Sequence, residues 1–308
     1  MSNVAILFPG QGSQFNNLGA DFMSYPTYAS VQESLFAKLP KCQQALIGEL
    51  DINDTRYAQP ILFANQVGIL EVVKSTFDIS NAVFGGFSLG EYSAYYATGK
   101  YSLEQGLEII AKRSELMASV TTSYDTKVVL GLTKEQLIEV TRELNTKVDN
   151  PVIISNYNLE KQLLINFDHA DSELVVDGLK AAGAKRVVDL AVSGPFHTKL
   201  YSDAADQFQA YIAGAELNEG TDNLYLNLTG RKYNGENLAV VMHDHMITGV
   251  AWKTEIESMI ADGIDTFVEL GSKSVVGAMV KKIDRSVNVI TVQTVEDLEK
   301  LEDVWNKK

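Results

Sequence analysis

Residues 82–99 read AVFGGFSLGEYSAYYATG, and this stretch decides the fold. The apolar run at 82–84 predicts a buried strand, and the residues after Gly90 predict a helix that Gly99 closes. Ser88 stands between them in the pattern Gly-x-Ser-x-Gly, which is typical of a nucleophile elbow when it joins a strand to a helix. The flanking positions need glycine because a side chain there would clash with the strand or the helix. We therefore predict that Ser88 is a catalytic nucleophile; the alternative is a glycine-rich turn with a capping serine.

Outward from this stretch, short apolar runs alternate with segments of helical spacing. Strands are expected at 4–8, 224–228, 266–270 and 287–292. The alternation favours a parallel sheet with helices on both faces. The expected helices are 18–23, 61–77, 90–98, 103–120, 199–213, 237–247, 253–262 and a last one that ends at about 283.

The pattern changes between residues 126 and 191. The segments there read in the order β-α-β-β-α-β, which is the ferredoxin-like order, inserted into the chain. We therefore expect residues 126–192 to form a small subdomain, and residues 1–125 and 193–308 to form the larger domain. The expected strands are 127–132, 152–157, 162–167 and 185–192, with helices at 133–144 and 172–182.

The composition describes an acidic globular chain. It has 308 residues, of which 45% are hydrophobic, and a formal net charge of −14. Such a charge repels nucleic acid and anionic membranes, so neither is an expected partner. One cysteine, Cys42, excludes an intrachain disulfide, and no apolar stretch is long enough to span a membrane, so we expect a cytoplasmic protein. An acidic ligand would need a local basic patch, for which the candidates are Lys112-Arg113, Lys185-Arg186, Arg231-Lys232 and Lys281-Lys282 with Arg285.

A serine nucleophile needs a base, and the chain has four histidines. His197 follows a Gly-Pro turn at the junction of the two predicted domains, where a cleft is expected, so we predict that it is the base. His169 reads as part of a surface turn. His243 and His245 lie two residues apart on one predicted helix and make no metal site. No acid stands out as a third member of a triad.

The loop at 9–14, PGQGSQ, contains Gly-x-Gly after a predicted strand. A dinucleotide fingerprint would need a third glycine where Phe15 stands, so we exclude a nicotinamide cofactor. A loop of backbone donors facing Ser88 is the better interpretation, because oxyanion holes combine the N–H after the nucleophile with one from a separate loop.

Several further motifs occur together along the whole chain: Phe8-Pro9-Gly10-Gln11-Gly12-Ser13-Gln14, Gln59-Pro60, Gly86-Phe87-Ser88-Leu89-Gly90-Glu91-Tyr92-Ser93-Ala94, Arg113 with Met117, Asn156-Tyr157-Asn158, Pro195-Phe196-His197, Trp252 and Glu269-Leu270-Gly271. With these landmarks, in this order and spacing, the chain resembles the malonyl-CoA:acyl carrier protein transacylases of fatty-acid synthesis and the acyltransferase domains of polyketide synthases. The resemblance implies an α/β-hydrolase-like large domain with a ferredoxin-like insert.

The resemblance also implies residue roles. Ser88 would take malonyl from malonyl-CoA with His197 as base, and holo acyl carrier protein would then accept it. The backbone amides of Gln11 and Leu89 would form the oxyanion hole, and Arg113 would pair with the malonyl carboxylate. The further residues expected at the substrate are Gln59, Met117, Asn156, Phe196 and His245. No cofactor or metal is expected, and we expect a monomer.

His245 departs from the family, which usually has glutamine there, so the support of His197 is the open question. Two other functions stay open: a serine thioesterase or esterase on the same scaffold, and a non-catalytic module that binds carrier protein or CoA. If carrier protein is the partner, its own acidic surface would need a cation at the cleft mouth, for which we expect Lys185, Arg186 or Lys199.

Overall fold

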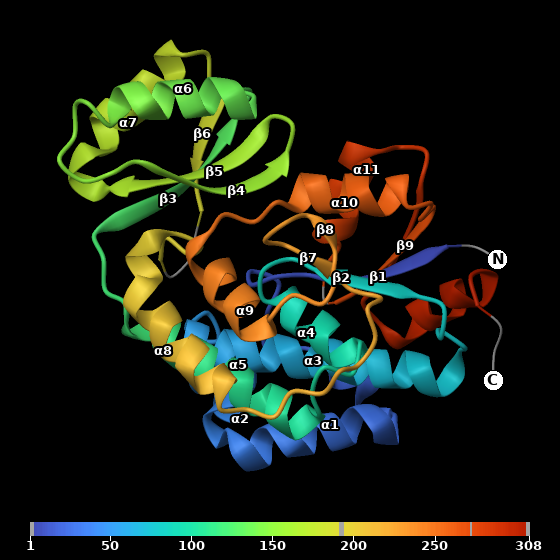
Figure 1. Cartoon of the computed structure of the whole chain (residues 1–308). Helices are drawn as coiled ribbons and strands as arrows, with labels where there is room; N and C mark the ends of the chain where they lie inside the picture. The colour runs from blue at the N-terminus through green and yellow to red at the C-terminus, as the bar shows by residue number, and fades with distance from the viewer. Residues whose placement is uncertain (1–2, 191–193, 272, 306–308) are drawn as a thin grey trace.

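A parallel four-stranded sheet forms the centre of the larger part of the molecule (Figure 1). The computed structural model describes residues 3–190, 194–271 and 273–305. The strand order is β10-β9-β1-β2, with β1 at Val4–Phe8, β2 at Val83–Gly86, β9 at Thr266–Leu270 and β10 at Asn288–Val292. Phe8 pairs with Gly86 at the carboxyl ends of β1 and β2, so the loops that follow these two strands begin side by side.

Helices cover both faces of this sheet, as the alternation of segments predicted. One face packs under α10 and α11, which contribute Trp252, Ile256 and Val280 to its core. The other face carries a thicker layer of helices around α3, whose residues from Ile61 to Val73 are almost all buried. The helices of the two layers are α1 (Pro26–Lys38), α2 (Pro40–Leu46), α3 (Thr55–Thr76), α4 (Gly90–Ala97), α5 (Leu103–Ser119), α8 (Ser202–Ala213), α9 (Leu238–Ile247), α10 (Trp252–Ala261) and α11 (Val276–Ile283).

Three expected elements differ in detail. The helix expected at 61–77 begins six residues earlier, at Thr55, where the Asp54 side chain caps it, and it carries Pro60 inside. The strand expected at 224–228 is only Tyr225–Leu226 (β7), which pairs with Arg231–Lys232 (β8). The segment expected to be helical at 18–23 is a 3-10 helix at Ala20–Ser24.

A second, antiparallel sheet stands apart from the first (Figure 1). Its order is β4-β5-β3-β6, and α6 and α7 pack on it. This is the β-α-β-β-α-β order predicted from the sequence; the end of the strand expected at 185–192 lies outside the described residues. The α/β class with an inserted antiparallel sheet is therefore confirmed, and we propose that the two sheets mark two domains. The elements are β3 (Tyr124–Leu130), α6 (Lys134–Leu144), β4 (Ile153–Leu159), β5 (Gln162–Asp168), α7 (Ser172–Ala181) and β6 (Arg186–Asp189).

Among the described residues, none of the helices combines the length and the apolar character needed to cross a membrane. The same part of the chain contains no group of three or more metal-binding side chains that could hold an ion.

The turn between β2 and α4 brings three backbone segments very close together. Ser88 has a φ of 53°, in the left-handed region that residues with a side chain rarely occupy. A Cβ on Gly90 would lie 2.0 Å from the Phe8 carbonyl oxygen, and one on Gly86 would lie 2.1 Å from the Gly90 carbonyl carbon. Both glycines are therefore required by the close approach of β1, β2 and α4.

We predict that Gly90→Ala lowers the free energy of unfolding by about 3 kcal/mol, because the backbone of β1 must move to admit the methyl group. Urea denaturation measures the loss. Gly214→Ala is the control, since a Cβ there meets its nearest atom at 3.5 Å, and it should change stability by less than about 0.5 kcal/mol. Equal stability of the two variants would contradict the close approach described above.

Candidate active site

Ser88 and His197 meet as the sequence predicted. The Ser88 Oγ lies 2.7 Å from the His197 Nε2. The elbow presents Ser88, and the loop after Gly194 presents His197, which is 4% exposed and has a positive φ of 62°. Two side chains separated by 109 residues are thus held at hydrogen-bond distance, the geometry of a serine nucleophile and its base.

A backbone carbonyl takes the place of a triad acid. The His197 Nδ1 lies 2.7 Å from the carbonyl oxygen of His245. A carbonyl only accepts, so Nδ1 must carry the proton, and Nε2 then faces Ser88 as the acceptor. The sequence offered no acid for this position because the partner is a main-chain atom.

The His245 side chain stacks on the His197 ring, with centroids 4.9 Å apart and an interplanar angle of 28°. Its Nδ1 lies 3.6 Å from the Glu91 Oε1, and both residues are fully buried. Neither ring nitrogen makes a hydrogen bond to any residue that the structure describes. His245 therefore packs behind the His197 ring and is not among the residues that line the cavity beside Ser88.

Burial sets the protonation of this pair. Burial and, to a smaller extent, the positive charge of Arg113 lower the pKa of His197 to about 4. The same effects, with the charge of His197, lower the pKa of His245 well below its usual value. Both rings are neutral at neutral pH, so His197 is free to accept the Ser88 proton.

A small cavity of about 90 Å³ opens beside Ser88. Of the residues singled out in the sequence, it brings together Gln11, Ser88, Asn156, Phe196 and His197. Among the described residues, the N–H groups of Gln11 and Leu89 meet no hydrogen-bond acceptor, as an oxyanion hole requires. Phe87 and Gly194, which belong to the elbow and to the Gly-Pro turn, also line it. The sequence did not single out the remaining lining residues, which carry no motif of their own: Thr126, Ser155, Leu164 and Leu190.

Arg113 is buried behind this site on the inward face of α5, with 1% exposure. Its Nη1 donates to the Gln59 Oε1 at 2.5 Å, and its guanidinium carbon lies 4.9 Å from the Tyr92 ring centroid. Its Nε and Nη2 make no hydrogen bond to any described residue. A buried guanidinium with unused donors is a site for an anion. Because Arg113 is buried, it cannot belong to a basic surface patch with Lys112, which was one of the candidates from the sequence.

Gln59 contacts Arg113 and Met117 contacts Gln59, and neither residue lines the cavity. The Gln59 Nε2 donates to the Thr55 Oγ1 at 2.7 Å and approaches the Met117 Sδ at 3.5 Å. The Thr55 hydroxyl in turn donates to the Gln11 side-chain oxygen at 3.1 Å. The first turns of α3 therefore connect the Gln11 loop with the buried cation.

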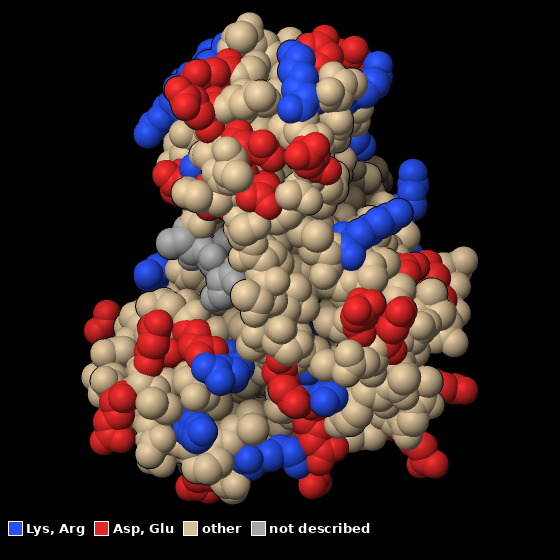
Figure 2. All heavy atoms as spheres, turned by 90° about the vertical axis from the view of Figure 1, so that its left-hand side faces the viewer, with Lys and Arg blue, Asp and Glu red and all other residues tan. Residues whose placement is uncertain are grey.

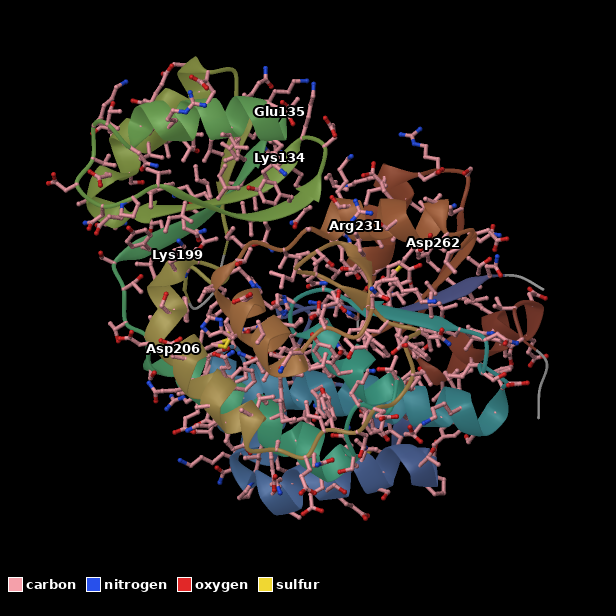
Figure 3. All side chains as sticks on the ribbon, in the orientation of Figure 1. Lys134, Glu135, Lys199, Asp206, Arg231 and Asp262 are labelled. Atoms are coloured by element: carbon pink, nitrogen blue, oxygen red, sulfur yellow. The ribbon has the colours of Figure 1, made fainter. Side chains whose placement is uncertain are left out.

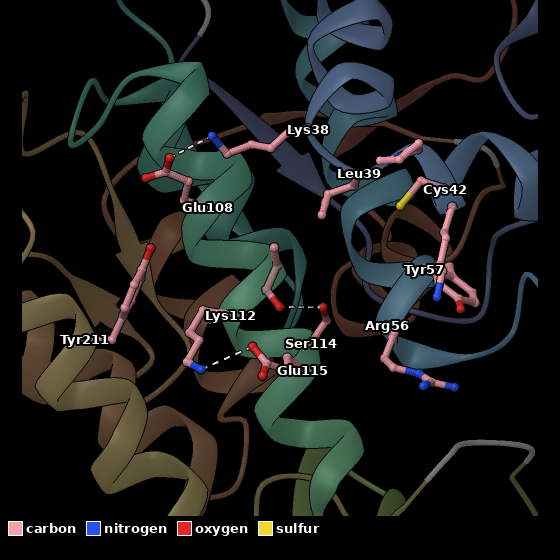
Figure 4. A pocket seen from close by; sticks show the side chains of 13 residues that line it. Lys38, Leu39, Cys42, Arg56, Tyr57, Glu108, Lys112, Ser114, Glu115 and Tyr211 are labelled. Carbon is pink, nitrogen blue, oxygen red and sulfur yellow. Dashed lines mark hydrogen bonds and ion pairs between the residues drawn. The ribbon is translucent and has the colours of Figure 1, made fainter.

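A larger cavity, of about 570 Å³, lies elsewhere (Figure 4). It is bounded by α5 on one side and by the ends of α1, α2 and α3 on the other. Lys38 pairs with Glu108 and Lys112 with Glu115 in its walls. Neither Ser88 nor His197 borders it, so its size does not make it the candidate active site.

A family model for the acyl transferase domain matches residues 6–301. The chain belongs to the acyl transferase family. It is 31% identical over 310 residues to the malonyl CoA-acyl carrier protein transacylase of Bacillus subtilis, covering 97% of this chain and 96% of that protein. The Staphylococcus aureus protein of the same name is 29% identical, and the match covers all of this chain and 99% of that protein.

Solved structures agree with the model over nearly all of its length. The Streptococcus pneumoniae malonyl transacylase has a TM-score of 0.91 at 29% identity, with 98% of this chain and all of that chain covered. A malonyl-transacylase solved in complex with the acyl carrier protein of a type II polyketide synthase has a TM-score of 0.91 at 27% identity, with the same coverage. The family predicted from the sequence is therefore confirmed, and the chain is an acyltransferase.

We predict that acylation of Ser88 stays near its maximal rate down to about pH 5.5, where a histidine of ordinary pKa would have lost about tenfold. The sign follows from the lowered pKa, since neutral His197 is the active form and is lost only as the pH falls through about 4. Rapid quench and mass spectrometry measure the rate, with circular dichroism at each pH as the control for folding. A midpoint near 6.5 would contradict the buried, neutral base.

Proposed function

We propose that this acyltransferase moves a malonyl group from malonyl-CoA to the phosphopantetheine thiol of an acyl carrier protein, through an ester on Ser88. The observation that carries the proposal is a buried arginine with unused donors behind a Ser–His pair 2.7 Å apart. The relatives named above support it, because they carry the name malonyl CoA-acyl carrier protein transacylase.

The first half-reaction forms the ester. His197 Nε2 takes the Ser88 proton as Oγ attacks the thioester carbonyl, and the C–S bond then breaks. The imidazolium returns the proton to the leaving CoA sulfur. In the second half-reaction, His197 takes the proton of the carrier thiol, the sulfur attacks the ester carbonyl, and Ser88 leaves with the proton restored.

In both half-reactions, negative charge develops on the tetrahedral oxyanion and positive charge on His197, and backbone groups are placed to stabilise each. The tetrahedral oxyanion would accept from the N–H groups of Gln11 and Leu89, which donate to no residue that the structure describes. The imidazolium that forms on His197 would keep its Nδ1 hydrogen bond to the His245 carbonyl. No cofactor is needed for this chemistry, because each step is a proton transfer or an acyl transfer.

Arg113 would select the acyl group. Gln59 occupies one guanidinium nitrogen, which leaves Nε and Nη2 to bind a carboxylate in a bidentate pair. An acetyl group would leave the buried charge unpaired, which is unfavourable. Phe196 and Asn156 border a cavity small enough to suit a short acyl group.

We predict that Arg113→Ala lowers malonyl loading of Ser88 by about 100-fold, since a charge-assisted bidentate pair is lost, while acetyl loading is largely retained. Competition between malonyl-CoA and acetyl-CoA, read by mass spectrometry of the loaded protein, measures the preference. Arg142→Ala is the matched control, because the Arg142 side chain is 69% exposed and pairs with Glu139 on the same helix, α6. An unchanged malonyl preference in Arg113→Ala would reject its role.

A serine thioesterase remains the competing function, and the fate of the ester separates the two. Transfer predicts an ester that persists until carrier protein is added, whereas a thioesterase would hydrolyse it at once. An ester that is lost in water as fast as it forms would reject the proposal.

Lys199 is the cation best placed to guide an acidic carrier protein. It is exposed and begins a 3-10 helix two residues after His197, where the two sheets adjoin (Figure 3). Lys185 and Arg186 are also exposed but lie beside Leu130, four residues along β3 from the cavity residue Thr126. Figure 2 shows charges of both signs scattered above and below a middle band with few charges, so the described residues form no large basic patch on this face. Location in the cytoplasm and a monomeric state remain predictions from the sequence.

We predict that Lys199→Glu raises the KM for holo acyl carrier protein severalfold at low salt, with little change in loading from malonyl-CoA, because like charges then meet at the mouth. Steady-state kinetics at two salt concentrations measure the effect, which should shrink as salt screens it. Lys185→Glu makes the same charge change at the far end of the small sheet and serves as the control. The assignment fails if both variants behave alike.

A further inference from the structure

Asn227 lies directly beneath the elbow, with no exposed surface. Its Oδ1 accepts the Ser88 N–H at 2.7 Å. Its Nδ2 donates to the Gly86 carbonyl at 2.6 Å and to the Glu255 Oε2 at 2.7 Å. The orientation of the amide is forced, since the Ser88 N–H needs an acceptor and the Gly86 carbonyl needs a donor.

The main chain of Asn227 is fixed as firmly as its side chain. Its N–H donates to the Glu91 Oε2 at 2.5 Å, and its carbonyl accepts from the Ala251 N–H at 2.9 Å. Asn227, the residue that follows β7, therefore contacts four parts of the site: the end of β2, Ser88, the first turn of α4 and the start of α10.

The contact matters because Ser88 is strained. A residue with a side chain at positive φ is disfavoured by about 1–3 kcal/mol and persists only where its surroundings hold it. If the Ser88 N–H lost its acceptor, the turn could relax and carry Oγ away from the His197 Nε2. A misplacement of about 1 Å can slow a reaction by about 100-fold.

We infer that Asn227 is a positioning residue for the nucleophile: its amide, oriented by Glu255, holds the Ser88 backbone so that Oγ meets His197. The inference rests on the proposed role of Ser88. Asn227 lies 139 residues from Ser88 in a segment with no motif, so the sequence did not single it out.

Other side chains at 227 fit less well. Aspartate keeps an acceptor for the Ser88 N–H but loses the amide donor, so it would set a carboxylate oxygen against the Gly86 carbonyl oxygen. Serine is too short to reach all three partners.

At Glu255, burial raises the pKa of the carboxyl well above its usual value, so the carboxyl is neutral and glutamine is its close substitute.

The test compares Asn227→Asp and Asn227→Ser with the unmodified chain. We expect the single-turnover rate of malonyl-Ser88 formation to fall by about 100-fold, with the KM for malonyl-CoA changed by less than about twofold. Asn65→Ala is the matched control, because it removes another buried amide, bonded to the Tyr28 hydroxyl within the α1–α3 layer. The Asn65→Ala variant should be less stable than the unmodified chain but should form malonyl-Ser88 at the same rate.

Wild-type acylation in folded Asn227→Asp, or a loss no greater than in Asn65→Ala at equal stability, would overturn the inference. If neither Asn227 variant folds, Glu255 decides: Glu255→Gln should keep the rate, and Glu255→Ala should slow acylation about tenfold through a misoriented amide. An unchanged rate in Glu255→Ala would overturn it equally.

Acylation by p-nitrophenyl acetate separates this inference from the proposed function, because the ester reports on Ser88 without requiring malonyl-CoA. Slow reaction of the Asn227 variants with this ester, in a chain that never forms malonyl-serine, would keep the positioning role and reject malonyl transfer. A malonyl-serine formed equally fast in all variants would do the reverse.

Discussion

The backbone of Ser88, turned to a φ of 53°, is the constraint on which the rest of the site depends. The turn is possible because Gly86 and Gly90 let β1, β2 and α4 approach to distances that no side chain would permit. The Phe87 N–H donates to the Phe8 carbonyl, which ties the elbow to β1. The parallel sheet and its register therefore serve one local geometry, in which a serine hydroxyl projects from the end of a strand.

His197, the proposed base, is held by neutral groups. His197 takes its orientation from a backbone carbonyl and a stacked neutral ring, where many serine enzymes use a carboxylate. A carbonyl dipole stabilises an imidazolium less than a full negative charge does. The hydrogen bond to the His245 carbonyl raises the pKa of His197, but burial outweighs it and lowers the pKa to about 4. Such a weak base suits thioesters, which are more reactive toward a nucleophile than amides are.

Local patterns in the sequence predicted much of this architecture. The elbow and the order of the inserted elements follow from patterns in neighbouring residues, and the structure has both. Pairing of Ser88 with His197 followed from the scarcity of histidines and the resemblance to a family.

The remaining features depend on contacts that a linear pattern does not reveal. The carbonyl of His245 acts through the main chain, so its residue type gives no sign of the contact. Asn227 follows a two-residue strand whose position is set by tertiary pairing. The wall formed by Thr126, Ser155 and Leu164 depends on how the small sheet is placed over the elbow.

In chain order, the small sheet begins with β3 and ends with β6. These two strands are direct neighbours in the sheet, with Lys127 beside Asp189. A unit whose two ends lie together can be exchanged in one piece without breaking the chain around it. This unit supplies Asn156 and Thr126 to the cavity, whereas Ser88 and His197 belong to loops outside it. Exchange of the unit among relatives would therefore change one wall of the cavity while leaving Ser88, His197 and Arg113 in place.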